Sequence, residues 1–263
     1  MINSLKIEWL KMRNYRTFWV LAVLFVLCIV GLNFSMNFNL NNSHTKGPNP
    51  ISMIIGNPFD FPDVWQTVTF WSGLVLFIPG LLMLILITNE YNFKTHRQNI
   101  IDGTSRFDFV FSKIILVLLF SVISTLIVAL TALAAGFIKG NMPFSTDKIV
   151  YVFYFFLQAV TYILSGALFG FVLKRAGLAV SLYLIYIFLL KYILSAFLNR
   201  IYSGVGDNFP VRSADNLIPF QLWQKVGGQF FKEPNASILI STTIVYIVLF
   251  YFIIVRKFQK EDL

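Results

Sequence analysis

The side chains best suited to acid–base or metal chemistry are few, and several stand close together in one segment, residues 89–113. This segment reads NEYNFKTHRQNIIDGTSRFDFVFSK and contains Glu90, His96, Asp102 and Asp108. Carboxylates and an imidazole that converge on one point could transfer protons or bind a metal ion. Their spacing matches no metal-binding pattern, and the second histidine of the chain, His44, is distant in sequence. We therefore predict no metal site and no catalytic residue here.

Nucleotide chemistry has no predicted place in this chain either. The phosphate-binding pattern G-x-x-x-x-G-K-[ST] is absent, so no loop is predicted whose backbone amides would hold nucleotide phosphates. We expect no cofactor bound by this chain. One cysteine, Cys28, cannot form a disulfide framework.

Six long apolar stretches make up most of the sequence. Each has about 20 residues or more, which at about 1.5 Å per residue crosses a hydrocarbon core of about 30 Å. Backbone groups in lipid find partners only within a helix or a closed barrel. With 57% hydrophobic and 13% charged residues, the chain is predicted to be an all-α, polytopic membrane protein with six transmembrane helices in a single domain, residues 1–263. The stretches are Phe18–Met36, Val64–Thr88, Ile114–Ile138, Ile149–Leu173, Ala176–Leu198 and Ala236–Val255.

The placement of positive charge predicts the orientation. The N-terminal segment and the loops after the second, fourth and sixth stretches carry 13 Lys and Arg, whereas the alternate loops carry seven. The positive-inside rule then places both termini and residues 89–113 in the cytoplasm. Charge spread along a membrane surface predicts membrane lipids as partners and, without a nucleic-acid motif, no nucleic acid.

The elements on either side of residues 89–113 should hold it in place. In residues 1–17, Ile2, Leu5, Trp9 and Met12 share one helical face, which predicts a helix lying in the inner interface. Within the segment, residues 90–101 have a composition compatible with a helix. Gly103 suits the positive φ just past a helix end, and Ser105-x-x-Asp108 suits a capping box that opens the third span. A short cytoplasmic helix between two spans can carry force from a soluble partner to the bundle.

Two small-residue patterns predict how the spans bend and pack. Pro79 and Gly80 lie in the middle of the second span and predict a kink. Gly166-x-x-x-Gly170 in the fourth span allows close helix approach. We favour packing within one chain over a contact between two copies.

Lys191, in the fifth span, is the only charge inside any predicted span. Its insertion cost of about 3 kcal/mol is offset by the apolar residues around it. We favour a side chain that snorkels toward the outer surface. The alternative is a side chain that faces a cavity and meets an acidic headgroup or carboxylate, which would put Lys191 on a translocation path.

The longest outer loop, residues 199–235, is unusually apolar at Leu217–Trp223. We predict a re-entrant region in which a short helix dips into the outer leaflet, with Trp223 at the interface. The alternative is a lid packed on the outer surface of the bundle.

Taken together, the six spans, the basic lead helix, a Glu directly after the second span and the helix ending in Gly103-Thr104-Ser105-Arg106 resemble the membrane subunit of an ABC transporter of the type-2 permease group. The segment Lys94–Gly103 is similar to permeases of Bacteroidetes-type bacteria, and Ile218-Pro219-Phe220 before the last span also fits the group.

The resemblance implies partners and a role for the cytoplasmic segment. The first inner loop would be a coupling helix that docks on a separate ATPase subunit, which binds ATP and magnesium. Six spans are half of the usual set, so a second permease copy or paralogue and two ATPases are implied, in a bacterial inner membrane and with transport leaning to export. Glu90 is also expected to pair with Lys11 or Arg13. The implied ATPase contact consists of Glu90, Thr95, His96, Arg97, Gln98, Asn99, Ile100, Ile101 and Asp102.

Other readings of the residues remain open. His96 could be a hydrogen-bonded contact residue, which we favour, or a pH switch. A non-catalytic membrane scaffold is not excluded by any motif. An ion-coupled secondary transporter is disfavoured, because none of the twelve Asp and Glu residues lies within a predicted span.

Overall fold

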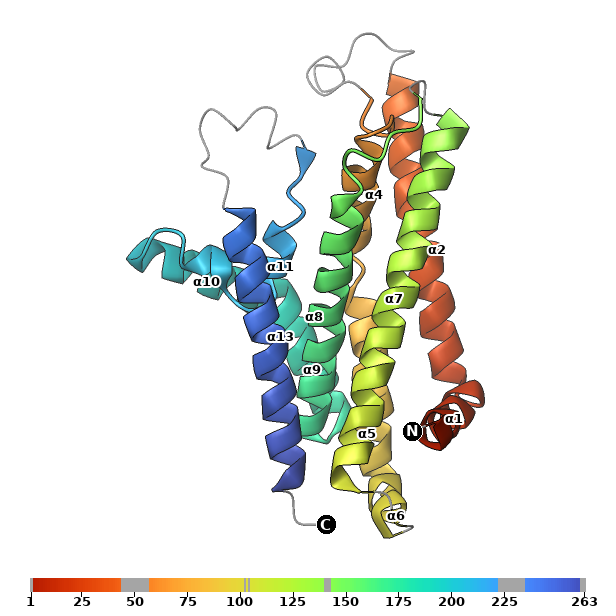
Figure 1. The fold of residues 1–263 in the computed structure, drawn as a ribbon, viewed down its shortest axis with the longest axis vertical. Helices are drawn as coiled ribbons and strands as arrows, with labels where there is room; N and C mark the ends of the chain where they lie inside the picture. Colours follow the sequence, from red (N-terminus) through yellow and green to blue (C-terminus); the bar gives the residue numbers. More distant parts are fainter. Residues whose placement is uncertain are drawn as a thin grey trace.

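The chain folds as a helical bundle elongated along one axis (Figure 1). The computed structural model describes residues 2–43, 57–101, 103, 105–139, 143–221 and 235–260. Every regular element within these residues is a helix, as predicted. In chain order they are α1 (Ile2–Arg13), α2 (Arg16–Ser43), α4 (Val64–Gly73), α5 (Phe77–Asn92), α6 (Thr95–Ile101), α7 (Arg106–Lys139), α8 (Val150–Leu173), α9 (Ala176–Ile185), the π-helix η2 (Tyr186–Leu190), α10 (Lys191–Ile201), the 3-10 helix η3 (Gly206–Asn208), α11 (Arg212–Asn216) and α13 (Ala236–Gln259).

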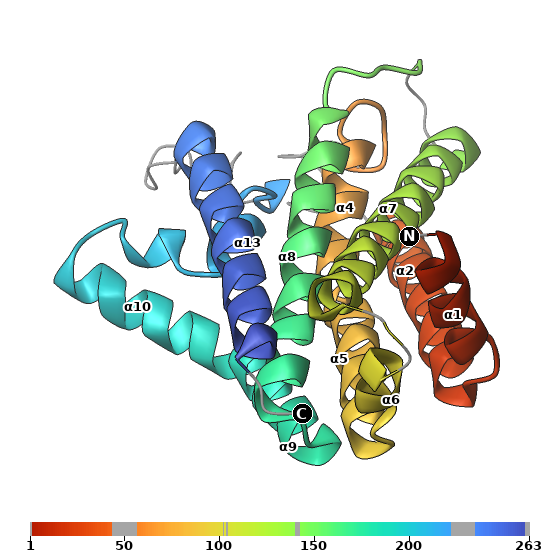
Figure 2. The ribbon, with the colours of Figure 1, turned by 60° about the horizontal axis from the view of Figure 1, so that its bottom comes forward.

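Five helical segments of the described residues are long and apolar enough to cross a membrane, and the bent pair α4–α5 is a sixth candidate if the pair counts as one span. All six predicted stretches correspond to these segments. The α8 span is 72% buried within the protein, against 22–39% for the other four unbroken spans. Figures 1 and 2 show α8 between α5, α7 and α13. α8 is therefore the central helix, and the others leave much apolar surface facing outward.

The predicted kink in the second span is confirmed. α4 and α5 meet at an angle of 41°. At the junction, successive backbone amides donate to the third residue back, as in Val75 to Ser72 (3.2 Å) and Ile78 to Val75 (3.0 Å). Pro79, which has no N–H and whose ring hinders a bond to the carbonyl four residues back, sits in the first turn of α5, where an N–H is not needed. The proline thus favours a new helix at Phe77.

The Gly166-x-x-x-Gly170 pattern packs within the chain, as we favoured. A Cβ at Gly166 would collide with the carbonyl of Gly80, and a Cβ at Gly80 would collide with the Tyr183 ring. At Gly170 it would lie 3.1 Å from Cβ of Ile87. The glycines let α5 and α8 approach at backbone contact.

A methyl group at this contact should be costly. We expect Gly166→Ala to lower the free energy of unfolding by about 1–3 kcal/mol, because backbone must move to accept it. Gly31→Ala in α2 is the matched control, since nothing lies within 4 Å of a Cβ there. Unfolding of both variants in mixed micelles checks this, and equal stabilities would contradict the close approach.

One end of the bundle carries α1, α6 and the C-terminal end of α13 (Figure 1). We call this the α6 end. It brings together three regions that are far apart in sequence. The first and the last described helices both reach this end, as the predicted orientation requires.

The fifth span is interrupted in its middle. The π-helix η2 separates α9 from α10 immediately before Lys191. Figures 1 and 2 show α10 extending away from the other helices. An extra residue in a helical turn rotates the side chains that follow, and here it places Lys191 toward the bundle.

The outer loop is partly described. Its short helix is α11, at Arg212–Asn216, and lies before the apolar run rather than on it. Leu217 and Ile218 are buried, at 3% and 2% exposure, in the main hydrophobic cluster. Residues 222–234, with Trp223, lie outside the described residues, so the interfacial position of Trp223 stays a prediction.

Candidate functional site

The helix α6 is a separate, short element at the α6 end. α5 continues to Asn92, and Lys94 then adopts a left-handed φ of 56°. This backbone angle ends α5 and turns the chain. The helix expected over 90–101 is therefore divided, and its second part, α6, begins at Thr95.

Hydrogen bonds to the C-terminal end of α5 hold the start of α6 in place. The backbone carbonyl of Glu90 lies 3.0 Å from Nδ1 of His96 and accepts a bond from the Thr95 hydroxyl at 3.5 Å. The His96 ring is 5% exposed and packs on the Tyr91 ring at 4.6 Å between centroids. His96 is therefore a buried anchor.

The predicted turn and capping residues between α6 and α7 are present. Gly103 has a φ of +96°, as its predicted position requires. The Ser105 hydroxyl accepts a bond from the Asp108 amide (3.0 Å) and donates to the Asp108 carboxylate (2.7 Å). The predicted Ser–Asp cap is thus present, although the carboxylate bonds to the Ser105 hydroxyl and not to its backbone amide.

The proposed contact residues divide by exposure. Arg97, Gln98 and Ile101 are exposed, Ile101 at 84%. Thr95, Asn99 and Ile100 are half-buried, and His96 is buried. Asp102 lies outside the described residues. One face of α6 thus offers a cation, an amide and an uncovered apolar side chain to a partner.

Glu90 is turned away from that face, into a buried group of four charges. Its Oε1 accepts bonds from Nζ of Lys113 (2.6 Å) and Lys11 (2.9 Å). Glu8 of α1 accepts from Lys113 (2.5 Å) and Lys11 (3.3 Å). We call Glu8, Lys11, Glu90 and Lys113 the Lys113 cluster. It joins α1, α5 and α7, and it balances two positive charges with two negative ones.

Sequence reasoning anticipated the Lys11–Glu90 pair and missed Glu8 and Lys113. Lys113 falls in the predicted loop because the apolar stretch begins at residue 114, but α7 begins at Arg106 and Lys113 is 1% exposed. The predicted face of the lead helix is also wrong in part. Trp9 is 49% exposed, and Glu8 and Met12, four residues apart, form the buried face. The spacing of four residues between Glu8 and Met12 could have indicated that both lie on the same face of α1.

Lys191 does not snorkel. It is 2% exposed, and its Nζ donates to Oδ2 of Asp215 (2.6 Å) and to the Tyr162 hydroxyl (2.5 Å). Of the alternative, the contact with a carboxylate is confirmed, whereas the cavity and the translocation path stay predictions. Snorkelling fails because α11 re-enters the bundle and brings Asp215 to the lysine, whereas a lone cation would have to reach water.

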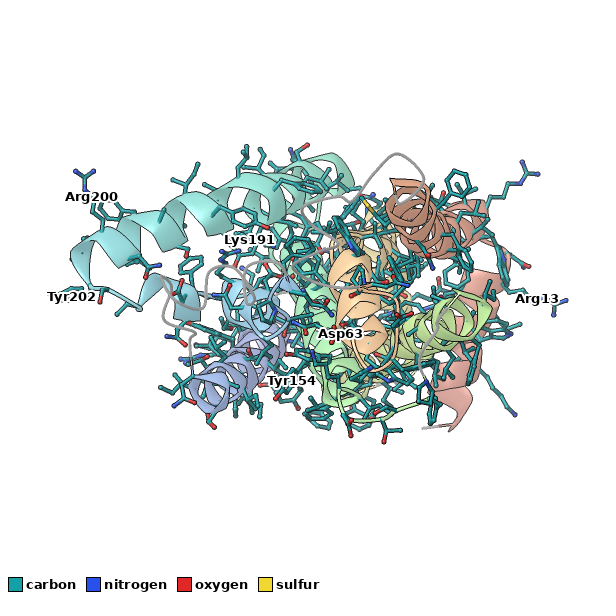
Figure 3. All side chains as sticks on the ribbon, turned by 90° about the horizontal axis from the view of Figure 1, so that it is seen from above. Arg13, Asp63, Tyr154, Lys191, Arg200 and Tyr202 are labelled. Carbon is teal, nitrogen blue, oxygen red and sulfur yellow. The ribbon has the colours of Figure 1, made fainter. Side chains whose placement is uncertain are left out.

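Two further side chains complete this arrangement on the Asp215 carboxylate. Oδ1 accepts from the Tyr162 hydroxyl (2.8 Å) and from Nε2 of Gln158 (3.0 Å). We call Gln158, Tyr162, Lys191 and Asp215 the Lys191 cluster. From above, Lys191 lies toward the bundle, whereas Arg200 and Tyr202 lie at the far end of α10 (Figure 3).

Comparison with protein-family models matches residues 4–205 to the ABC-2 family transporter protein family. The chain belongs to that family. It is thus a multi-pass permease, the membrane component of an ABC transporter, as the resemblance implied. A search of curated proteins found no match.

Family membership also bears on the ion-coupled alternative. The sequence argument against it was incomplete, because Asp215 lies in a loop and still reaches a lysine inside a span. Membership in the ABC-2 family disfavours this alternative instead. In this family an ATPase subunit supplies the energy, so the permease itself needs no catalytic residues.

Proposed function

We propose that this permease exports a hydrophobic or amphipathic substrate, driven by ATP that separate subunits hydrolyse. Two permeases, either two copies or this chain with a paralogue, would pair with two ATPases that bind ATP and magnesium. Closure of the ATPase pair would move the two bundles between inward-open and outward-open states as rigid bodies. The orientation follows the charge distribution, with the α6 end in the cytoplasm of a bacterial inner membrane.

The observation that carries the proposal is the form of α6. It is a seven-residue helix with an exposed Arg97, Gln98 and Ile101, and its opposite side is fixed to α5 through His96. An isoleucine at 84% exposure next to polar side chains is suited to a protein groove. A short helix held at both ends moves as a rigid unit, so a displacement of the ATPase would pass through α6 to the spans.

The Lys113 cluster supports a division of roles among the proposed residues. Arg97, Gln98 and Ile101 would touch the ATPase, with Asn99, Ile100, Thr95 and Asp102 beside them. Glu90 and His96 would act as positioning residues that hold α6 on the spans. Through Lys113 and Lys11, movement of α5 would also reach α7 and α1.

The membrane contacts follow from the exposed apolar side chains. On α1, Ile7, Trp9 and Leu10 are 48%, 49% and 59% exposed. A helix with such residues at the α6 end would lie in the inner interface, where the exposed Lys6 meets lipid headgroups.

The first experiment is isolation of the full chain in mild detergent with identification of bound proteins. We expect a small ATPase at equal stoichiometry. Its reproducible absence would favour the alternative of a non-catalytic membrane scaffold.

Charge reversal on α6 tests the contact itself. We expect Arg97→Glu to reduce vanadate-sensitive ATPase activity of the complex by about tenfold or more, because a charge-assisted contact and its geometry are lost. Arg256→Glu is the matched control, an exposed arginine at the same end on α13. If both variants lose the same activity, α6 has no special role.

A further inference from the structure

Arg212, at the start of α11, is a cation without a matching anion. It stands three residues before Asp215, but that carboxylate is occupied by Lys191, Tyr162 and Gln158. Among the described residues, no carboxylate forms an ion pair with Arg212. Arg212 and the Lys191 cluster therefore hold two positive charges and one negative charge.

The guanidinium also has an unused donor. Nε of Arg212 is buried and has no hydrogen-bond partner among the described residues. Its recorded contact is with the ring of Tyr192, 4.9 Å from Cζ to the centroid. Buried donors are nearly always satisfied in folded proteins, by protein groups or by water, so this donor is available to a group from outside the chain.

Lys191 lies near the Arg212 guanidinium, because both contact the ring of Tyr192. Its Nζ is also 4.9 Å from the centroid of the Tyr192 ring. The two cations are thus at most about 10 Å apart, on one tyrosine. Because Asp215 neutralises one of the two cations, an anion at Arg212 would feel one net positive charge, in surroundings where water screens it poorly.

The site is accessible and is held rigidly. Arg212 is half-buried, and Tyr192 is 43% exposed on α10. α11 is fixed by the Lys191 cluster and by the hydrogen bond between Thr243 and Ser213 (3.1 Å). A guanidinium on a fixed element loses little freedom on binding, and its fork matches a carboxylate or phosphate.

Exposed apolar side chains flank this position on η2 and α10. Leu189 and Ile193, on either side of Tyr192 in sequence, are 55% and 60% exposed. A ligand with an alkyl chain could cover this surface while its charged group meets Arg212.

We propose that Arg212, beside the Lys191 cluster, binds the phosphate or carboxylate group of an amphipathic molecule. The molecule is either a membrane lipid, through its headgroup, or an anionic cargo. Only the cargo source depends on the proposed transport function.

The test measures binding by the purified full chain with native mass spectrometry. The probes are dodecyl phosphate and phosphatidylglycerol, with dodecylphosphocholine and phosphatidylcholine as zwitterionic counterparts. We expect the anionic probes to bind and Arg212→Gln to weaken them by about tenfold or more, the effect of losing a charge-assisted hydrogen bond. Arg212→Lys should bind with intermediate affinity, because it keeps the charge and loses the fork.

Arg200→Gln provides the matched control. It removes an exposed arginine from the far end of α10 (Figure 3) and leaves Arg212 in place. The proposal is overturned if neither anionic probe binds, if Arg212→Gln binds them like the wild type, or if Arg200→Gln loses as much. Because Arg212 makes no side-chain hydrogen bond to another described residue, Arg212→Gln should fold, and its thermal unfolding alongside the control verifies this.

The two sources are separated by competition. Phosphatidylglycerol that binds alone and is not displaced by dodecyl phosphate identifies a membrane lipid. Dodecyl phosphate that binds in excess phosphatidylglycerol identifies a cargo-like amphiphile. Both results support the site. Since neither requires an ATPase, failure of the proposed transport function would leave this test unchanged.

Discussion

Lys113→Met is expected to lower the free energy of unfolding by about 3–5 kcal/mol, because it leaves two buried carboxylates with one cation. Glu8 and Glu90 are 6% and 7% exposed, so water can solvate neither well. Lys11, whose side chain is 29% exposed, would remain as their one shared partner. Unfolding of the purified chain in mixed micelles measures the loss.

Restoring the charge balance should recover much of this stability. In Lys113→Met with Glu90→Gln, the pair Glu8–Lys11 remains within α1. We expect the double variant to regain at least half of the loss, since an uncompensated buried charge is the main cost. Lys257→Met, an exposed lysine at the same end, should change stability by less than about 0.5 kcal/mol. A double variant as unstable as Lys113→Met would refute the charge-balance explanation.

The second large effect is expected at the Lys191 cluster. Asp215→Asn leaves Lys191 buried inside a span with neutral partners such as the Tyr162 hydroxyl and without its carboxylate. We expect a loss of about 3–5 kcal/mol, again because one partner of a buried pair is removed. The same unfolding measurement applies, with Asp147→Asn as an exposed control.

Removal of both charges should be much less costly than removal of one. Lys191→Met with Asp215→Asn deletes the ion pair and leaves Tyr162 and Gln158 able to bond to the new amide. We expect stability near the wild-type value, as for other buried pairs replaced together. If Asp215→Asn alone is neutral, Lys191 reaches water and the snorkelling interpretation was right after all.

Several features could be predicted because they depend on neighbouring residues alone. Stretches of apolar residues must become helices in lipid, so the number and order of the spans were predictable, although α7 begins eight residues before the predicted stretch. Gly103 and the Ser105–Asp108 cap are short-range backbone requirements. The kink at Pro79 follows from a missing amide.

The start of a span was less predictable where charged residues fold into it. An apolar window ends at the first lysine, but a lysine can enter a helix end if a carboxylate meets it there. Lys113 does so because α1 supplies Glu8 from 105 residues away. The residues next to Lys113 in sequence give no sign of its contact with Glu8.

The sequence by itself determined that this chain is a six-span helical membrane protein with a short polar helix between its second and third spans. Only the tertiary structure decided which charges are paired: Glu90 with Lys113, and Lys191 with Asp215. The physical reason is the sequence separation over which each interaction acts. Hydrophobic length and backbone capping act within a few residues, whereas a buried charge is stable only beside a partner, and the fold alone brings that partner from elsewhere in the chain.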